Sequence, residues 1–228
     1  MSAAHADTEP DRAEEFGSRR IFLPPPRDPR RAALYRDWLR KLGLDAAGRK
    51  LARKHLKAQP GESLLHMGCG DGGFTVELKG QHPQLEIEGV DPDAEAVSAA
   101  AELSTERGVH VLFKKGYPQD LPATSERHDV VLCLLFLYRM QTDQDRGDAL
   151  GEFKRVLRPG GRLLLIEPGV HSRGPRGWLM KKLAACEPGL RAQLNAGLET
   201  LLKQAGFEDV KSLERGAAGL VAAEGVKK

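Results

Sequence analysis

Short apolar segments alternate with longer amphipathic or mixed segments along most of the chain. Runs of apolar residues predict strands at 63–67, 85–90, 109–115, 128–137 and 161–167. The segments between them predict helices over about 45–57, from near Gly73, over 93–108 and over 143–157. Residues 128–137 are almost continuously apolar, which is typical of a strand buried on both faces. Strands that alternate with helices predict an α/β fold whose parallel sheet is covered on both sides.

The C-terminal region breaks this alternation. A helix is predicted over about 189–205, and Gly206 ends it. Two apolar segments follow, FEDVKSLE and GLVAAEG, and only the residues RGAA separate them. A parallel crossover needs about a dozen residues or more, so these two strands are predicted to be antiparallel neighbours.

The N-terminal region divides into a tail and a helix. Residues 1–29 are polar and end in LPPPRDP, which predicts a disordered, Pro-rich tail. Residues 30–228 are predicted to form a single domain, in which 30–58 are N-terminal helices and 167–188 are a variable insert on the substrate side. The first helix places Tyr35 and Trp38 on its apolar face, where they either pack in the core or close over a ligand.

The composition is that of a soluble globular protein. The chain has 228 residues, of which 40% are hydrophobic and 29% are charged. Its three cysteines are scattered, which argues against a disulfide framework or a zinc site and favours a reducing compartment. The N-terminus is acidic without an apolar core, and no apolar run is long enough to be a transmembrane segment. We therefore expect a cytoplasmic protein.

The net charge of +3 is small but unevenly spread. Residues 19–57 hold thirteen Lys or Arg residues against three Asp residues. A solvated helical surface explains this excess most simply. The alternative is a surface for an anionic partner, such as a peripheral membrane contact made by the basic N-terminal helices or a contact with nucleic acid.

The segment LLHMGCGDGGF places four glycines within six residues, directly after the first predicted strand. Open α/β sheets bind ligands at the carboxyl ends of their strands, and glycines let backbone N–H groups approach a ligand. Gly68, Gly70 and Gly73 satisfy G-x-G-x-x-G, the dinucleotide fingerprint. With Gly72 the loop also satisfies G-x-G-x-G, the pattern of enzymes that use S-adenosylmethionine (SAM). Asp91 ends the next strand and can accept hydrogen bonds from the ribose of either ligand, so the loop alone leaves both open.

Segments further along the chain separate these two ligands. LLHMGCGDGGF, GVDPD, GYPQDLP, HDVVLCLLFL and FKRVLRPGGRLLLIEPG occur in this order. Together they resemble the class I SAM-dependent methyltransferases, especially the small-molecule branch that includes quinone-biosynthesis and phospholipid methyltransferases. The resemblance covers about residues 45–225. It implies a Rossmann-like, seven-stranded, mostly parallel sheet with a C-terminal antiparallel strand pair and helices on both faces. A nicotinamide dehydrogenase has no reason to carry the RPGG turn or the final strand pair.

The resemblance implies which residues contact the cofactor. Gly68, Cys69 and Gly70 would pass beside its methionine part, and Asp91 would bind the ribose hydroxyls. The loop after the third strand would line the adenine together with Pro92, and the end of the fourth strand would face the cofactor from the other side. The implied cofactor-binding residues are His66, Gly68, Cys69, Gly70, Asp91, Pro92, Tyr117, Pro118, Cys133 and Leu134.

Two of these positions depart from the family. The residue before M-G-C-G is usually an acid that helps to orient the cofactor's ammonium, whereas here it is His66. Tyr117 stands where an Asp often accepts the adenine amino group. A neutral imidazole can accept one hydrogen bond, whereas a protonated one would repel the ammonium. We therefore expect SAM binding to weaken as the pH falls through about 6.5, and His66→Asp to tighten it.

No catalytic triad is expected, and no catalytic residue is assigned. Methyl transfer from a sulfonium is an in-line displacement, in which the protein mainly aligns the reactants and excludes water. Contacts with the acceptor are expected from the first helix, from the 167–188 insert and from Phe136, Tyr138 and Arg139. Tyr138 and His171 are candidate proton acceptors, although packing and loop exposure, respectively, explain them more simply.

These features predict a SAM-dependent methyltransferase that acts on a small-molecule or lipid-like acceptor. The alternative is a methyltransferase-like domain that has lost turnover and serves as a binding or scaffold partner, which His66 and Tyr117 motivate. Methylation of nucleic acid ranks last, because the fourth strand ends in CLLFLY and lacks the Asn/Asp-Pro-Pro-aromatic signature.

Overall fold

The computed structural model describes residues 15–16, 19–20, 43–140, 142–169, 197–217 and 219–228. The predicted helix over 30–42 and the part of the insert from residue 170 onward lie outside these residues, as does most of the predicted tail. Within the tail, β1 (Glu15–Phe16) and β2 (Arg19–Arg20) form a separate antiparallel pair.

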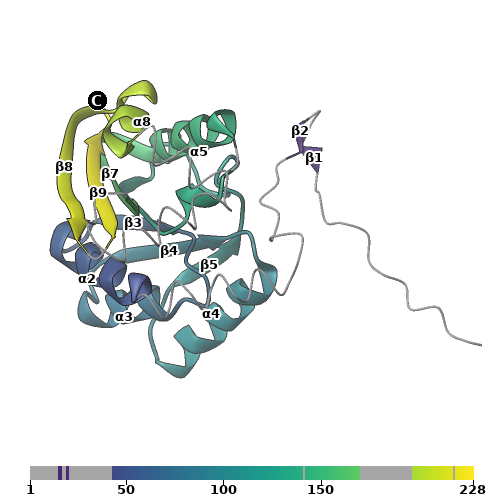
Figure 1. Cartoon of the computed structure of the whole chain (residues 1–228). Coiled ribbons are helices and arrows are strands. Elements are labelled where there is room, and N and C mark those ends of the chain that lie inside the picture. Colours follow the sequence, from purple (N-terminus) through teal and green to yellow (C-terminus); the bar gives the residue numbers. More distant parts are fainter. Residues whose placement is uncertain (1–14, 17–18, 21–42, 141, 170–196, 218) are drawn as a thin grey trace, which may run out of the picture.

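Seven strands form one mixed sheet. They are β3 (Ser63–Met67), β4 (Glu86–Asp91), β5 (Leu112–Lys115), β6 (His128–Leu134), β7 (Leu157–Pro168), β8 (Glu208–Ala217) and β9 (Leu220–Val226). Their order across the sheet is β5-β4-β3-β6-β7-β9-β8 (Figure 1). Neighbours from β5 to β7 run parallel, and β9 runs antiparallel to both β7 and β8. The predicted sheet and its closing strand pair are confirmed.

Helices flank the sheet, and their starts follow local capping chemistry. They are α2 (Leu44–Leu56), α3 (Gly73–Gln81), α4 (Ala94–Glu106), α5 (Asp143–Val156) and α8 (Leu198–Gln204). α4 starts after Asp93, whose carboxylate accepts the N–H groups of the next turn, and α5 starts after Thr142, whose hydroxyl does the same. α3 starts after Gly72, which has no side chain to cap it. Asp71 accepts the N–H of Gly73, and the next N–H groups of the first turn are left for a ligand. None of the described helices is long and apolar enough to cross a membrane.

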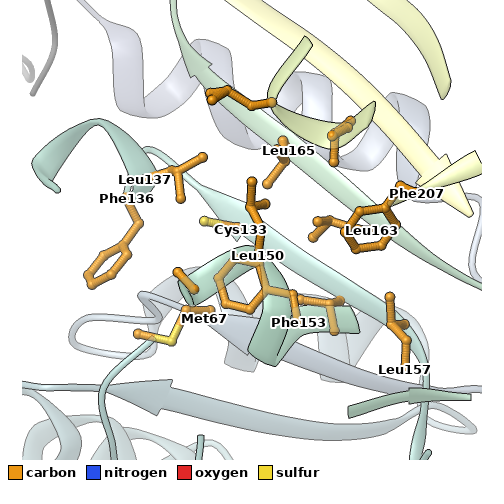
Figure 2. Packing of buried hydrophobic residues seen from close by; sticks show 14 of the residues in the cluster. Met67, Cys133, Phe136, Leu137, Leu150, Phe153, Leu157, Leu163, Leu165 and Phe207 are labelled. Atoms are coloured by element: carbon orange, nitrogen blue, oxygen red, sulfur yellow. The ribbon is translucent and has the colours of Figure 1, made fainter. Parts of the chain in front are cut away.

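The sheet is packed on both faces. On one face, Leu65 and Met67 of β3 lie in a cluster with α5 and α8, which also contains Cys133 of β6 (Figure 2). On the other face, Leu64 of β3 lies in a cluster with α2 and α3. Successive residues of a strand point to opposite faces, so His66 follows Leu64 to the α2 and α3 side.

The RPGG segment, residues 158–161, bulges out of β7. The strand pairs with β6 through Leu157 and again through Arg162, and the residues between leave the ladder. The N–H of Gly160 donates to the carbonyl of Lys227 at 2.7 Å, and the N–H of Lys227 donates to the carbonyl of Gly161 at 2.8 Å. The predicted turn is therefore a bulge that the C-terminal residues hold in place.

Two predicted strands are longer in the sequence pattern than in the structure. β5 begins at Leu112 rather than at 109, and β6 ends at Leu134 rather than at 137. After β6 the chain turns at Leu135, where φ is 52°, and then forms a short 3-10 helix, η1 (Leu137–Arg139). The apolar letters LLFLY resemble a continuing strand because a buried turn and a buried strand have the same composition.

The strand order identifies where a ligand should bind. From β3 the chain proceeds outward to β4 and β5, and then crosses back to add β6 on the other side of β3. Parallel sheets of this kind bind ligands outside the carboxyl ends of the strands, at the point where the order reverses. That point lies between the glycine loop after β3 and the turn after β6.

Candidate functional site

The glycine loop is held against β4 by its own backbone. The N–H groups of Gly68 and Cys69 both donate to the carbonyl of Val90, at 2.8 and 3.2 Å. The N–H of Gly70 donates to Oδ2 of Asp91 at 2.9 Å. Gly70 has φ 55°, and no heavy atom lies within 4 Å of the position that a Cβ would take there. The loop therefore presents an open side at Gly70 to a ligand.

The turn after β6 closes the other side of the loop. Phe136 is 2% exposed, and its ring packs directly on Gly68: a Cβ on Gly68 would come within 2.5 Å of that ring. Gly68 also has φ 78°, so a side chain there would be strained as well as blocked. The two elements on either side of the reversal point thus meet through a glycine and an aromatic ring.

Asp91, at the end of β4, is buried but retains acceptor capacity. It is 5% exposed, and each of its oxygens accepts one backbone N–H, from Gly70 and from Asp93. Burial raises the pKa of Asp91, while these N–H groups and the charge of Arg139 act in the opposite direction. A carboxylate oxygen has two lone pairs, so each oxygen can accept one further hydrogen bond. Pro92, the next residue, is half-buried.

His66 lies under the loop with one ring nitrogen unpaired. It is 2% exposed, and its Nδ1 is 2.7 Å from Oγ1 of Thr75 in α3. Its ring packs edge-on against Phe74, with 5.9 Å between the ring centroids. Its Nε2 is buried and has no hydrogen-bond partner in the described part of the chain. Buried polar atoms are nearly always hydrogen-bonded, so this nitrogen is a candidate for contact with a ligand.

The charge state predicted for His66 near neutral pH is wrong. Burial lowers the pKa of His66 to about 4, and the positive charge of Arg49 acts in the same direction. The imidazole is therefore neutral throughout the physiological range. SAM binding is therefore not expected to weaken near pH 6.5, because burial disfavours the charged imidazole and His66 is not protonated at that pH.

The turn after β5 brings a further unpaired group to the site region. The N–H of Asp120 donates to the carbonyl of Tyr117 at 3.0 Å, which closes the turn. Tyr117 is half-buried, and Pro118 is buried. Sequence reasoning missed Gln119: both polar atoms of its amide are buried, and neither has a partner among the residues described. An amide offers both donors and an acceptor, as recognition of an adenine edge requires.

The side chains of Cys133 and Leu134 pack inside the protein. The Cys133 thiol is fully buried and lies 3.8 Å from Oε1 of Glu167. Leu134 is 8% exposed and packs against Gly48 of α2, where a Cβ would come within 2.9 Å of it. Their contact with a cofactor stays a prediction.

The residues expected to contact the acceptor divide between packing and exposure. Tyr138 is 5% exposed and lies in the cluster of α2 and α3, in agreement with packing. Arg139 is exposed, and its guanidinium lies 5.3 Å from the ring centroid of Phe136 and within electrostatic reach of Asp91. His171 lies outside the described residues.

Sequence reasoning also missed Glu167, which organises the turn after β6. It is fully buried, and its Oε1 accepts the N–H groups of Phe136 and Leu137 at 3.0 and 2.8 Å. Its Oε2 accepts the N–H of Tyr138 at 3.2 Å. Burial raises the pKa of Glu167 to about 7, although these three donors oppose the shift. The available signal was an acid at the end of the otherwise apolar run LLLIE.

The site offers binding groups rather than an activated nucleophile. Burial raises the pKa of the Cys69 thiol to about 12, and burial also raises that of Cys133 well above its ordinary value. Thiols that stay protonated are poor nucleophiles. Within the described ranges, no group of three or more His, Cys, Asp or Glu side chains is placed to hold a metal.

The chain resembles known methyltransferases. Residues 64–161 match a family model described as "Methyltransferase domain". A demethylmenaquinone methyltransferase of Deinococcus radiodurans is 34% identical over 126 residues, which are 55% of this chain and 51% of the relative. A demethylmenaquinone methyltransferase of Thermus thermophilus is 31% identical over 129 residues, 57% of each chain. The chain therefore spans about half the length of the curated relatives it matches.

Solved structures share the fold. The structure of a SAM-dependent methyltransferase from Aquifex aeolicus superposes with a TM-score of 0.62 and 19% sequence identity. The match covers 88% of this chain and 99% of that one. At this identity the likeness concerns the fold alone, and it agrees with the seven-stranded sheet described above.

Proposed function

We propose that this member of the class I SAM-dependent methyltransferase family binds SAM at the carboxyl ends of β3 and β4 and transfers its methyl group to a small-molecule or lipid-like acceptor. One observation carries the proposal. At Gly70 the glycine loop is open to a ligand, and the N–H of this residue donates to Asp91. Asp91 is a buried carboxylate that can still accept two hydrogen bonds.

The residues present fit this cofactor. The carboxylate of Asp91 suits a ribose diol, which needs two acceptors on one group. The unpaired amide of Gln119 suits the adenine edge, and the unpaired Nε2 of His66 suits a polar group of the methionine part. The open side at Gly70 allows the ligand to approach the backbone. A nicotinamide dinucleotide is disfavoured by the family match.

When bound, SAM supplies a methyl group that is already activated by its attachment to a sulfonium. The chain's own residues then have to bind and orient the cofactor and the acceptor, and exclude water from them. Asp91 and the glycine loop fix the cofactor against β3 and β4, and Phe136 closes the loop at Gly68. Arg139, exposed beside Phe136, is placed to contact an acceptor that carries a negative or polar group.

The acceptor that we favour is a hydroquinone-type ring with an apolar tail. The support is that relatives matched over about half their length are named demethylmenaquinone methyltransferases. A screen with methyl-labelled SAM should compare such hydroquinones, with short and long tails, against unrelated phenols and amines. Transfer of label only to phenols or amines would overturn this choice of acceptor without affecting the proposal of methyl transfer.

Cofactor binding is the first test. Titration calorimetry of the full chain with SAM, and with its demethylated product S-adenosylhomocysteine, should give dissociation constants of about 1 mM or below, the usual range for enzyme ligands. NAD should give no heat of binding under the same conditions. Failure of both SAM and its product to bind at millimolar concentration would leave only the alternative of a binding or scaffold domain.

Gln119→Leu should separate affinity from stability. Loss of the amide should weaken the binding of S-adenosylhomocysteine by about tenfold, the effect of roughly one net hydrogen bond. The unfolding free energy without ligand should be unchanged or higher, because the variant no longer buries an unpaired amide. Calorimetry and urea unfolding measure the two effects, and Gln144→Leu, at an exposed position in α5, is the control. Lower stability with unchanged affinity would show that Gln119 is a packing residue.

A further inference from the structure

The hydrogen bond between His66 and Thr75 determines which imidazole nitrogen carries the proton. Thr75 is fully buried, and the Nδ1 of His66 is the only hydrogen-bond partner of its hydroxyl among the described residues. If Nδ1 carried the proton, the hydroxyl proton of Thr75 would be buried without an acceptor, and Nε2 would also lack a donor. Donation from Thr75 to Nδ1 pairs the hydroxyl proton and leaves only the Nε2 proton of His66 without a partner among the described residues. The neutral imidazole therefore carries its proton on Nε2.

This assignment reverses the polarity expected at the position. An acid would offer only acceptors to a ligand, whereas Nε2–H of His66 is a donor. It is buried, and no acceptor among the described residues pairs with it. The methionine part of SAM has one group that only donates, the ammonium, and one that only accepts, the carboxylate. The His66 donor matches the carboxylate.

The surroundings of His66 also favour an anion. Arg49 of α2 lies 5.9 Å from the ring centroid of Phe74, the ring that His66 packs against edge-on, and its charge acts on His66. The Nε of Arg49 forms an ion pair with Asp45, 3.0 Å from its Oδ2, and the two Nη groups of Arg49 make no hydrogen bond with the described residues. The ring of His66 also lies against the first turn of α3, where Asp71 accepts the N–H of Gly73 at 3.1 Å and the N-cap residue Gly72 offers no side chain to the following N–H groups. A cation and a helix N-terminus both stabilise a negative charge.

We propose that His66 and Arg49 bind the carboxylate of the methionine part of the cofactor, so that this end of the site selects for an anion where an acid would select for an ammonium. The inference rests on the proposed function. If His66 were only a poor replacement for an acid, His66→Asp would tighten cofactor binding. The carboxylate assignment predicts instead that His66→Asp weakens cofactor binding.

The experiment compares two thioethers that differ only in the carboxylate: S-adenosylhomocysteine and its decarboxylated counterpart. Calorimetry with the full chain should show the carboxylated ligand binding about tenfold or more tightly, the effect expected for hydrogen bonds to a charged group. His66→Leu should reduce that preference by about tenfold, and Arg49→Gln should reduce it by about fivefold. His66→Gln should retain most of it, because a Gln amide can accept from Thr75 and still donate to the ligand.

Controls separate this inference from the proposed function and from misfolding. Arg53→Gln is matched to Arg49→Gln, because Arg53 lies 5.3 Å from the same Phe74 ring but pairs with Glu77, and it should leave the preference unchanged. Circular dichroism of each variant reports folding. Absence of binding by either thioether would refute the proposed function itself. Binding without a preference, a preference that survives His66→Leu, or tighter binding of S-adenosylhomocysteine by His66→Asp would refute the carboxylate assignment alone.

Discussion

Asp91→Ala should raise the dissociation constant for S-adenosylhomocysteine by about 100-fold or more. Two ribose hydroxyls donating to one carboxylate are charge-assisted hydrogen bonds, each contributing roughly 1.5–3 kcal/mol, and the variant removes both. The variant also releases the N–H of Gly70, so the loop loses the bond that sets its position. Titration calorimetry measures the change directly, without the need for an acceptor.

Two further variants show whether this loss is due to the ribose contact. Asp91→Asn keeps one oxygen to accept the N–H of Gly70 but lacks the charge and the second acceptor, so most of the loss should remain. Asp93→Ala removes a neighbouring acid that caps α4. It should lower the free energy of unfolding by about 1 kcal/mol and leave affinity unchanged. Equal loss of affinity in the Asp91 and Asp93 variants would mean that both changes weaken binding by disturbing the fold of the β4–α4 connection, and not through a contact of Asp91 with the ribose.

The sequence predicts the parts of this site that depend on local pattern. Apolar positions recur with different periods in strands and in helices, so these elements can be recognised from a few residues. The glycine loop can be recognised in the same way, because it follows β3 directly. The antiparallel end of the sheet follows from the short RGAA connection, and the β8–β9 pair confirms it. Asp91 could be placed because it ends the strand that lies next to the loop.

The chemistry of individual groups could not be predicted in this way, because distant residues determine it. The charge state of His66 depends on its burial and on Arg49, and its tautomer depends on Thr75. The role of Glu167 depends on backbone N–H groups in η1 and the residue before it, about thirty positions earlier in the chain. For the same reason, the sequence predicts residues 135–137 as strand, although they lie in the turn after β6 and in η1. Their composition is that of a strand, but the carboxylate that accepts the N–H groups of this turn is on β7.

Glu167→Ala should lower the free energy of unfolding by about 3–5 kcal/mol. The change leaves the N–H groups of Phe136, Leu137 and Tyr138 buried without an acceptor, and each such loss costs roughly 1–3 kcal/mol before relaxation. Because Phe136 packs on Gly68, affinity for S-adenosylhomocysteine should fall too. Urea unfolding and calorimetry measure these effects. Glu152→Ala is the control: its carboxylate holds one backbone N–H and Arg155, and its loss should have a smaller effect on stability and none on affinity.

The contribution of the same carboxyl group to stability should depend on pH in an unusual direction. The pKa of Glu167 is about 7 in the folded chain against 4.5 for an ordinary Glu, so the folded state holds its proton more tightly. Its contribution is therefore fully present below about pH 4.5 and is lost as the pH rises through about 7, a change of roughly 3 kcal/mol. Urea unfolding between pH 5 and pH 8 should show this slope in the difference between the wild type and Glu167→Gln. The comparison is needed because the lowered pKa values of His66 and His128 make stability rise with pH up to about 6.5, and that contribution is common to both proteins. Glu62, whose pKa the bond to Arg162 lowers, contributes with the opposite sign, so Glu62→Gln should retain the slope above pH 5. The same pH dependence in the wild type and in Glu167→Gln would mean that the three N–H donors of the turn keep Glu167 ionised.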